Sequence, residues 1–233
     1  MAKRLIVTID GPAGAGKSTV GRKLAQALGY LYLDSGALYR AVAWQADRLS
    51  LDLDRPGVLA PFLAGLKLTA APGQDGFRLW VDGREVGEEL RSPEVSRQSS
   101  RVALRPEVRL WVTDKLRAWG RDGGVVAEGR DQGSVVFPQA QIKFYLDATL
   151  AVRAQRRRRD WHQDGDPPPL DQVKAELAAR DRQDTTRKEG PLTVPPGAVL
   201  MDTTEMSPEE VVNQCLARIK ILLDPGGLEN KPV

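Results

Sequence analysis

Short apolar runs alternate with amphipathic stretches along most of this chain, as in parallel sheets flanked by helices. Five runs have the length and β-branched content of buried strands, at residues 4–10, 30–33, 124–128, 142–147 and 198–202. Helical spacing fills the segments between and after them, at residues 16–28, 38–49, 106–119, 150–161, 170–187 and from Ser207 onward. We therefore predict an α/β fold with three layers, in which the five strands form one parallel sheet between helices.

The first and last of these helices carry clear boundary signals. The first helix has an apolar face and is followed by Gly29 as a stop; the face consists of Val20, Leu24, Ala27 and Leu28. The last helix has Ser207 as its cap and Pro208 at its first position. Both helices are therefore predicted to pack against the sheet.

The middle of the chain departs from the alternating pattern. After a short helix at 56–66, strands are predicted at 67–71, 77–81 and 84–86, with Asp82-Gly83 as a hairpin turn between the last two. A further helix is predicted at 93–102. We expect residues 36–102 to form an inserted subdomain, residues 1–35 and 103–225 to form the core, and residues 226–233 to form a flexible tail.

Polar side chains follow the predicted strands where each one ends, at Gly11, Asp34–Gly36, Glu128–Asp131 and Asp147. Ligands of parallel sheets bind at the carboxyl ends of the strands. A binding site is therefore expected where these segments meet.

A phosphate-binding loop follows the first strand. Residues 11–18 match the pattern G-x-x-x-x-G-K-[ST], with the sequence Gly11, Pro12, Ala13, Gly14, Ala15, Gly16, Lys17 and Ser18. A chance match in a chain of this length has a probability of about 1%. Small residues allow backbone N–H groups to surround a phosphate, the lysine reaches the β- and γ-phosphates, and the Ser18 hydroxyl can ligate Mg²⁺. This pattern predicts a P-loop NTPase-type fold that binds ATP with Mg²⁺.

Composition and charge narrow the class of ligand. The chain has 233 residues, of which 41% are hydrophobic and 28% charged, and its net charge is +3. This balance argues against a nucleic-acid partner, and no apolar run is long enough to suggest a membrane partner. Arginines gather at 153–159 and 180–187, which suggests a small polyphosphate ligand. With a single cysteine, Cys215, we expect a cytoplasmic protein, and without heptads we expect a monomer.

Two large classes of phosphate-loop protein lack support here. GTPases usually carry an Asn-Lys-x-Asp guanine signature, which this sequence does not contain. Motors and remodelling ATPases usually end a strand in two acidic residues, whereas the third strand here ends Ala127-Glu128-Gly129. A small-molecule kinase remains the preferred class.

Three motifs together resemble the bacterial cytidylate kinases: residues 9–19 (IDGPAGAGKST), 32–40 (YLDSGALYR) and 128–138 (EGRDQGSVVFP). The similarity extends from the first strand to the final helix. The resemblance implies transfer of the γ-phosphate of ATP to CMP or dCMP, with Mg²⁺. It also implies that residues 36–102 bind the monophosphate and that residues 153–169 form a short lid. Glu128 departs from the aspartate that this family often has before Gly129.

The resemblance also implies roles for individual residues. Thr19 and the lid arginines Arg153 and Arg157 join the phosphate loop in binding ATP. Phosphate and sugar of the acceptor are contacted by Ser35, Arg40, Arg130, Arg180, Asp184 and Arg187, and cytosine by Ser100, Arg109 and Asp131. The expected catalytic residues are Lys17, Arg130, Arg157 and Arg187.

Other interpretations of the same residues stay open. The acceptor could instead be UMP, AMP, shikimate or a cofactor precursor, or the arginines at 153–159 could bind RNA without catalysis. Arginine runs are usually solvated helix faces, and this applies to Arg156, Arg158 and Arg159. Structural roles are expected for Asp10, Asp34 as a helix cap, and Cys215 in the core; His162 is expected to be exposed.

Overall fold

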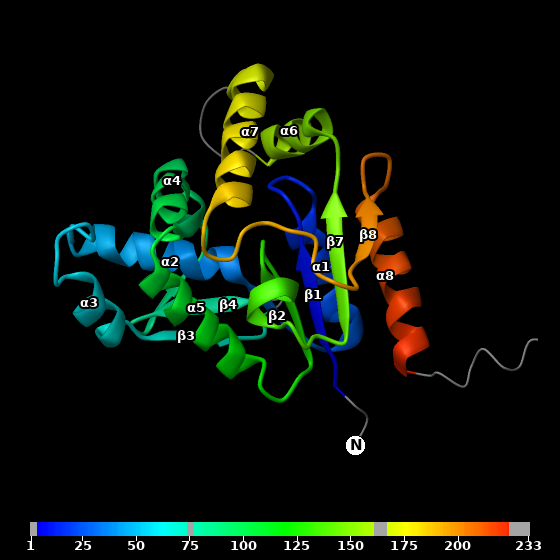
Figure 1. Ribbon diagram of the computed structural model, residues 1–233, viewed down its shortest axis with the longest axis horizontal. Coiled ribbons are helices and arrows are strands. Elements are labelled where there is room, and N and C mark those ends of the chain that lie inside the picture. The colour runs from blue at the N-terminus through cyan, green and yellow to red at the C-terminus, as the bar shows by residue number, and fades with distance from the viewer. Residues whose placement is uncertain (1–3, 74–76, 161–166, 224–233) are drawn as a thin grey trace, which may run out of the picture.

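The computed structural model describes residues 4–73, 77–160 and 167–223. Its main sheet contains five strands: β1 (Ile6–Asp10), β2 (Leu31–Asp34), β6 (Val125–Glu128), β7 (Ile142–Asp147) and β8 (Val199–Asp202). They lie in the order β2-β6-β1-β7-β8, and every neighbouring pair is parallel (Figure 1). The five-stranded parallel sheet predicted from the sequence is confirmed.

Helices cover both faces of this sheet. Successive strand residues point to opposite faces, so Val7 and Ile9 of β1 pack on one side and Ile6 on the other. The Val7 face is covered by α1 (Lys17–Leu28) and α8 (Pro208–Leu223), and the Ile6 face by α2 (Ser35–Arg48) and α5 (Pro106–Trp119). Cys215 lies fully buried in the first of these layers, as expected.

The inserted segment forms a small antiparallel sheet beside the Ile6 face. It contains α3 (Leu59–Gly65), β3 (Leu68–Ala71), β4 (Arg78–Val81), β5 (Arg84–Val86), a 3-10 helix (Glu88–Arg91) and α4 (Pro93–Val102). The predicted hairpin turn is confirmed, because Asp82 and Gly83 have φ angles of 49° and 82°. Apolar side chains of this segment, including Leu63 and Leu79, share one buried cluster with α5 and β6.

Several element boundaries differ from the sequence prediction. Helix α2 begins at Ser35 and not at residue 38, because the Asp34 carboxylate accepts a hydrogen bond from the Ala37 N–H (2.9 Å) and caps the helix. In α1, Ala25 is buried in place of Ala27, which is exposed. The sequence also gave no signal for a π-helix at Gln132–Val136, whose first N–H groups bond to the buried Asp10 carboxylate.

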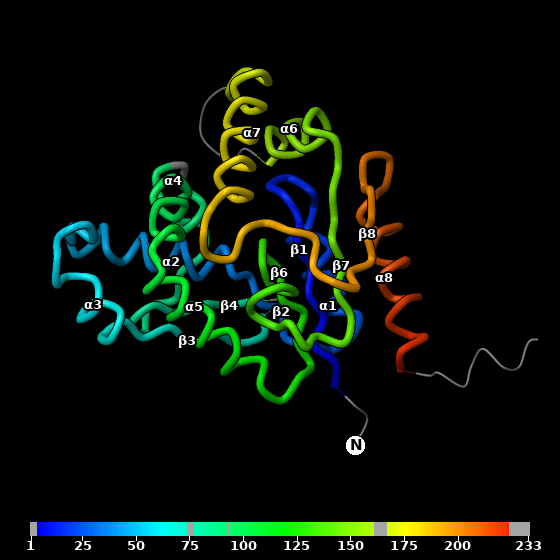
Figure 2. The backbone as a smooth tube through the Cα atoms, in the orientation of Figure 1, coloured from blue at the N-terminus to red at the C-terminus, as the bar shows by residue number. Residues whose placement is uncertain are grey.

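Two further helices lie beyond the carboxyl ends of the strands, α6 (Leu150–Arg159) and α7 (Leu170–Thr186) (Figures 1 and 2). Both helices pack against Ala13 of the phosphate loop, and α6 overlaps the lid expected at 153–169. Residues 161–166 of the expected lid, with His162, and residues 226–233 of the expected tail lie outside the described residues. None of the helices in the described ranges has the length and apolar character that a membrane span requires.

Candidate active site

The phosphate loop has the backbone that its glycines predict. Gly11, Gly14 and Gly16 have φ angles of 145°, 78° and 88°, which only glycine adopts easily. A Cβ atom at Gly11 would also collide with the carbonyl oxygen of Leu146. The loop therefore turns tightly from β1 into α1, with the N-terminus of the helix at Lys17.

Lys17 lies at the centre of this loop, with only 6% of its surface exposed. Its Nζ donates a hydrogen bond to the carbonyl oxygen of Pro12 (2.7 Å). Burial, helped by the nearby charge of Arg130, lowers the pKa of Lys17 from 10.5 to about 7. An anionic ligand in the loop would offset this burial and favour the charged form of the lysine.

Glu128 is a site residue whose role the sequence analysis missed. Its Oε1 accepts hydrogen bonds from the hydroxyls of Ser18 (2.6 Å) and Tyr32 (2.8 Å). Its Oε2 is buried and has no hydrogen-bond partner among the described residues. Burial raises the pKa of this carboxyl group. A hydroxyl and an unsatisfied carboxylate oxygen side by side suit a hard cation such as Mg²⁺. In the sequence, the signal that could have identified Glu128 as a site residue is its position at the end of a central strand.

The start of α2 lies beside this carboxylate. The Ser35 hydroxyl donates to the backbone carbonyl of Glu128 (2.8 Å), which fixes the predicted residue at the end of β6. Arg40, one turn further on, forms an ion pair with Asp34 (2.9 Å). Asp34 therefore has the structural role expected of it, as a cap and as the partner of Arg40.

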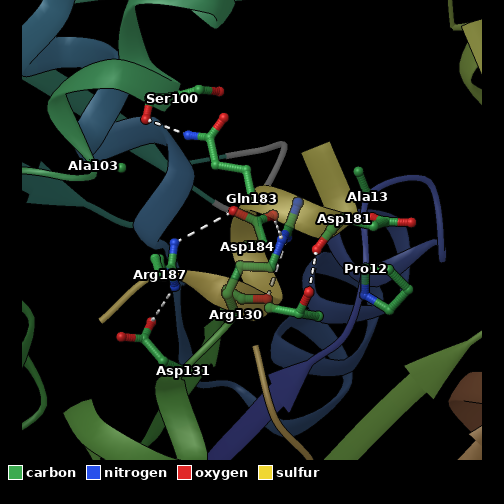
Figure 3. Close-up of polar contacts among 12 residues, drawn as sticks. Pro12, Ala13, Ser100, Ala103, Arg130, Asp131, Asp181, Gln183, Asp184 and Arg187 are labelled. Atoms are coloured by element: carbon green, nitrogen blue, oxygen red, sulfur yellow. Dashed lines mark hydrogen bonds and ion pairs between the residues drawn. The ribbon is translucent and has the colours of Figure 1, made fainter. Parts of the chain in front are cut away.

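A chain of alternating charges continues from Arg130 across the site (Figure 3). Arg130 pairs with Asp184 of α7 (2.8 Å), and Asp184 also contacts Arg187 (3.4 Å). Arg187 approaches Asp131 (3.9 Å), which in turn pairs with Arg109 of α5. Three arginines and two aspartates are thus joined in one largely buried network.

The pKa values in this network follow from burial and from the neighbouring charges. Burial raises the pKa of Asp131 despite the arginines around it. For Asp184, burial acts in the same direction, but Arg130 and Arg180 outweigh it and lower the pKa. Burial and the charge of Arg130 lower the pKa of Arg180 to about 10. Within the described ranges no side chain pairs with Arg180, so this cation is available to an anionic ligand.

The arginines of α6 differ in their surroundings. Arg153 is buried, and its guanidinium donates to the carbonyl oxygens of Ala148 (2.9 Å) and Ala13 (3.1 Å) and to Asp181 (2.6 Å). The prediction that Arg156 lies on a solvated helix face is wrong. Its guanidinium donates to the hydroxyl (2.9 Å) and the carbonyl oxygen (2.6 Å) of Thr203. Arg158 and Arg159 are exposed, as expected.

A cavity of about 190 Å³ brings most of the predicted residues together. Its walls include Ala13, Gly14, Lys17, Ser18, Ser35, Arg40, Ser100, Arg130, Asp131, Arg157, Arg180, Asp184 and Arg187. Arg109 and Arg153 lie behind these walls, as partners of Asp131 and Ala13. Tyr39 and Glu128 also line the cavity and were not among the predicted site residues.

Comparisons with known proteins agree with the sequence motifs. The family model described as "Cytidylate kinase" matches residues 7–221. A cytidylate kinase from Pelotomaculum thermopropionicum is 46% identical over 91% of this chain and 95% of its own length. A bifunctional pantoate ligase/cytidylate kinase from Synechococcus sp. (strain JA-2-3B'a(2-13)) is 43% identical over 97% of this chain. The chain spans 42% of the length of that bifunctional relative.

Among solved structures, the shikimate kinase from Bacteroides thetaiotaomicron is similar with a TM-score of 0.47 and 13% identity, covering 94% of this chain and 98% of its own.

Proposed function

This chain belongs to the cytidylate kinase family, and on that premise we propose that it transfers the γ-phosphoryl group of ATP to CMP or dCMP. The products are ADP and CDP or dCDP. The observation that carries the proposal is one cavity that has the phosphate loop on one side and several arginines on the other, namely Arg40, Arg130, Arg180 and Arg187. Such a cavity suits two phosphorylated ligands that meet end to end.

On the donor side, the phosphate loop from Gly11 to Thr19 binds the triphosphate of ATP. Lys17 contacts the β- and γ-phosphates, and its low pKa in the free protein supports such a role, because the phosphates restore its charge. Ser18 and Glu128 would hold Mg²⁺ through their oxygen atoms. When bound, Mg²⁺ would neutralise negative charge on the phosphates of ATP. Arg157 reaches the phosphates from the cavity wall, and Arg153 acts beside the loop that it contacts.

On the acceptor side, the arginines bind the monophosphate. Ser35 and four arginines around the cavity contact the phosphate and sugar, namely Arg40, Arg130, Arg180 and Arg187. Asp184 accepts hydrogen bonds from the ribose hydroxyls. Asp131 accepts from the cytosine amino group and Ser100 donates to a ring acceptor, while Arg109, which lies behind the cavity wall, takes part in reading the base through its ion pair with Asp131. Residues 36–102 are the monophosphate-binding subdomain in this proposal.

Transfer then needs positioned positive charge more than covalent help. The attacking oxygen belongs to a phosphate that is already largely ionised, so the protein supplies no general base. Lys17, Arg130, Arg157 and Arg187 offset the repulsion between the two anionic ligands and stabilise the charge on the transferred group. The lid at 153–169 closes over ATP and excludes water. We further propose that the protein acts as a monomer in the cytoplasm, without a nucleic-acid or membrane partner.

The test measures ADP production from ATP and Mg²⁺ with CMP, dCMP, UMP and AMP as separate acceptors. We expect kcat/KM to be highest with CMP or dCMP, because Asp131 pairs with an amino group that UMP lacks. Equal rates with AMP and CMP would contradict the cytosine assignment. ADP production that does not depend on any of the four acceptors would contradict the proposal as a whole.

A further inference from the structure

One hydrogen bond crosses the edge of the acceptor side of the cavity. The side-chain Nε2 of Gln183, on α7, donates to the backbone carbonyl oxygen of Ser100, on α4 (3.0 Å) (Figure 3). We propose that Gln183 is a positioning residue that fixes α4, and with it Ser100, against the acceptor-binding helix α7. Through this bond it sets the affinity for the acceptor and the selectivity for its base. The inference rests on the proposed function.

The carbonyl oxygen of Ser100 needs such a donor because α4 ends at Val102. The last carbonyl groups of a helix have no partner within it. Backbone N–H groups beyond the helix bond to Ser99, Arg101 and Val102 but not to Ser100. Gln183 therefore satisfies a helix-end carbonyl that the local backbone leaves free.

Among the described residues, this bond is also the one polar contact between α7 and the inserted segment. Across the described residues, no other hydrogen bond or ion pair joins α7 to the segment 36–102. Helix α7 carries Arg180 and Asp184, whereas α4 carries Ser100. The distance between the phosphate-binding and base-reading groups depends on how these two helices are held.

A second side chain holds the same end of α4 from the other direction. Arg109 of α5 donates to the carbonyl oxygen of Ala103 (3.2 Å) while it pairs with Asp131. Gln183 is the direct neighbour of Asp184, which pairs with Arg130. The end of α4 is thus joined to the Arg109–Asp131 pair by the bond from Arg109, and to α7 by the bond from Gln183.

The chemistry of the bond gives a matched set of variants. Gln183→Glu keeps the size of the side chain but places a carboxylate, which cannot donate, against a carbonyl oxygen. Gln183→Lys can donate again through its ammonium group. Gln172→Glu makes the same chemical change on the same helix, at an exposed site whose amide donates to Glu176 (3.1 Å).

The experiment measures steady-state kinetics with CMP, UMP and ATP and the thermal unfolding midpoint of all four proteins. For Gln183→Glu we expect KM for CMP to rise about 5- to 10-fold, the size of one lost hydrogen bond. We expect the ratio of kcat/KM for CMP over UMP to fall, with KM for ATP and kcat within about 2-fold of the wild-type values. Gln183→Lys should restore KM for CMP, and Gln172→Glu should behave as wild type.

The possible results separate this inference from the proposed function. An unchanged KM for CMP in Gln183→Glu, or the same rise in Gln183→Lys, would overturn the positioning role while the wild-type enzyme still phosphorylates CMP. A comparable rise in Gln172→Glu would overturn it too, by assigning the effect to charge on α7. A wild-type protein that does not phosphorylate CMP would overturn the proposed function first, and this inference with it.

Discussion

The two sides of the cavity are built in different ways. The donor side is built around one continuous segment, Gly11–Thr19, which is shaped by glycine backbone conformations between β1 and α1. The acceptor side is assembled from α2, α4, α5, α7 and the residues after β6, and it is held by side-chain charges. The phosphate loop can therefore lose a side chain and keep its shape, whereas the stability of the acceptor side depends on its ion-paired charges.

Lys17 and Asp131 show this contrast most directly. Lys17 is a buried cation in the loop, and its lowered pKa means that its charge is unfavourable in the free protein. Asp131 is a buried anion that two arginines, Arg109 and Arg187, stabilise and that in turn stabilises them. Removal of the Lys17 charge therefore relieves the free-energy cost of a buried cation. Removal of the Asp131 charge leaves Arg109 and Arg187 buried without this partner.

The largest expected effect is on the donor side. Lys17→Met should lower kcat about 10²- to 10³-fold with every acceptor, because the transferred phosphate loses the positive charge that Lys17 places beside it. The unfolding free energy should stay unchanged or rise, since a poorly solvated cation is removed. Steady-state kinetics and urea unfolding test both statements. A large loss of stability would show that the loop depends on Lys17 for its fold, and the two sides of the cavity would then not differ in this respect.

The acceptor side should respond in the opposite way. Asp131→Asn should reduce the preference for CMP over UMP about 10- to 100-fold, the size of one charged hydrogen bond. It should also lower the unfolding free energy by about 3–5 kcal/mol, because Arg109 stays buried without its partner. The same kinetic and urea measurements apply.

The double variant Arg109→Met/Asp131→Asn is the control for Asp131→Asn. Removal of both charges should restore part of the stability without restoring the base preference. If Asp131→Asn keeps its preference for CMP, Asp131 does not read the base.

The same contrast explains what the sequence could predict. The phosphate loop follows from residue type and spacing alone, because its geometry comes from a local run of small residues. Most strands and helices were also predicted. The exceptions are the 3-10 helix at Glu88–Arg91, the start of α2 and the π-helix at Gln132–Val136. The last two are held by the side-chain carboxylates of Asp34 and Asp10.

The acceptor residues could be named only through the family resemblance. Their contacts join positions such as Arg130 and Asp184 that are 54 residues apart in the sequence. Gln183, Glu128 and Arg156 gave no signal of their partners, because a hydrogen bond to a distant backbone carbonyl or hydroxyl leaves no trace in local spacing. Such contacts require the folded chain.

An intermediate effect is expected from the titration of Lys17. Because its pKa in the free protein is about 7, below its ordinary value of 10.5, Lys17 is mostly neutral at pH 8. Binding of ATP phosphates raises this pKa, so binding at pH 8 should take up close to one proton. The affinity for ATP should then fall up to about 10-fold for each pH unit above 8.

Calorimetry of ATP binding at pH 8, in buffers of different ionisation enthalpy, measures this uptake. Lys17→Met is the control and should show none. Equal uptake in both proteins would assign the proton to another group and remove the electrostatic argument for the donor side.

The smallest expected effect comes from the removal of helix caps. One cap lies on α8, away from the cavity, and the other lies on α4, on the acceptor side. Ser207 forms a reciprocal cap with Glu210 at the start of α8, and Ser92 caps α4 through the N–H of Val95 (3.2 Å). Ser207→Ala and Ser92→Ala should each lower the unfolding free energy by about 1 kcal/mol. Only Ser92→Ala should raise KM for CMP, because α4 carries Ser100. If both caps change KM equally, general stability and not the placement of α4 controls acceptor binding, and the contrast between the two sides fails.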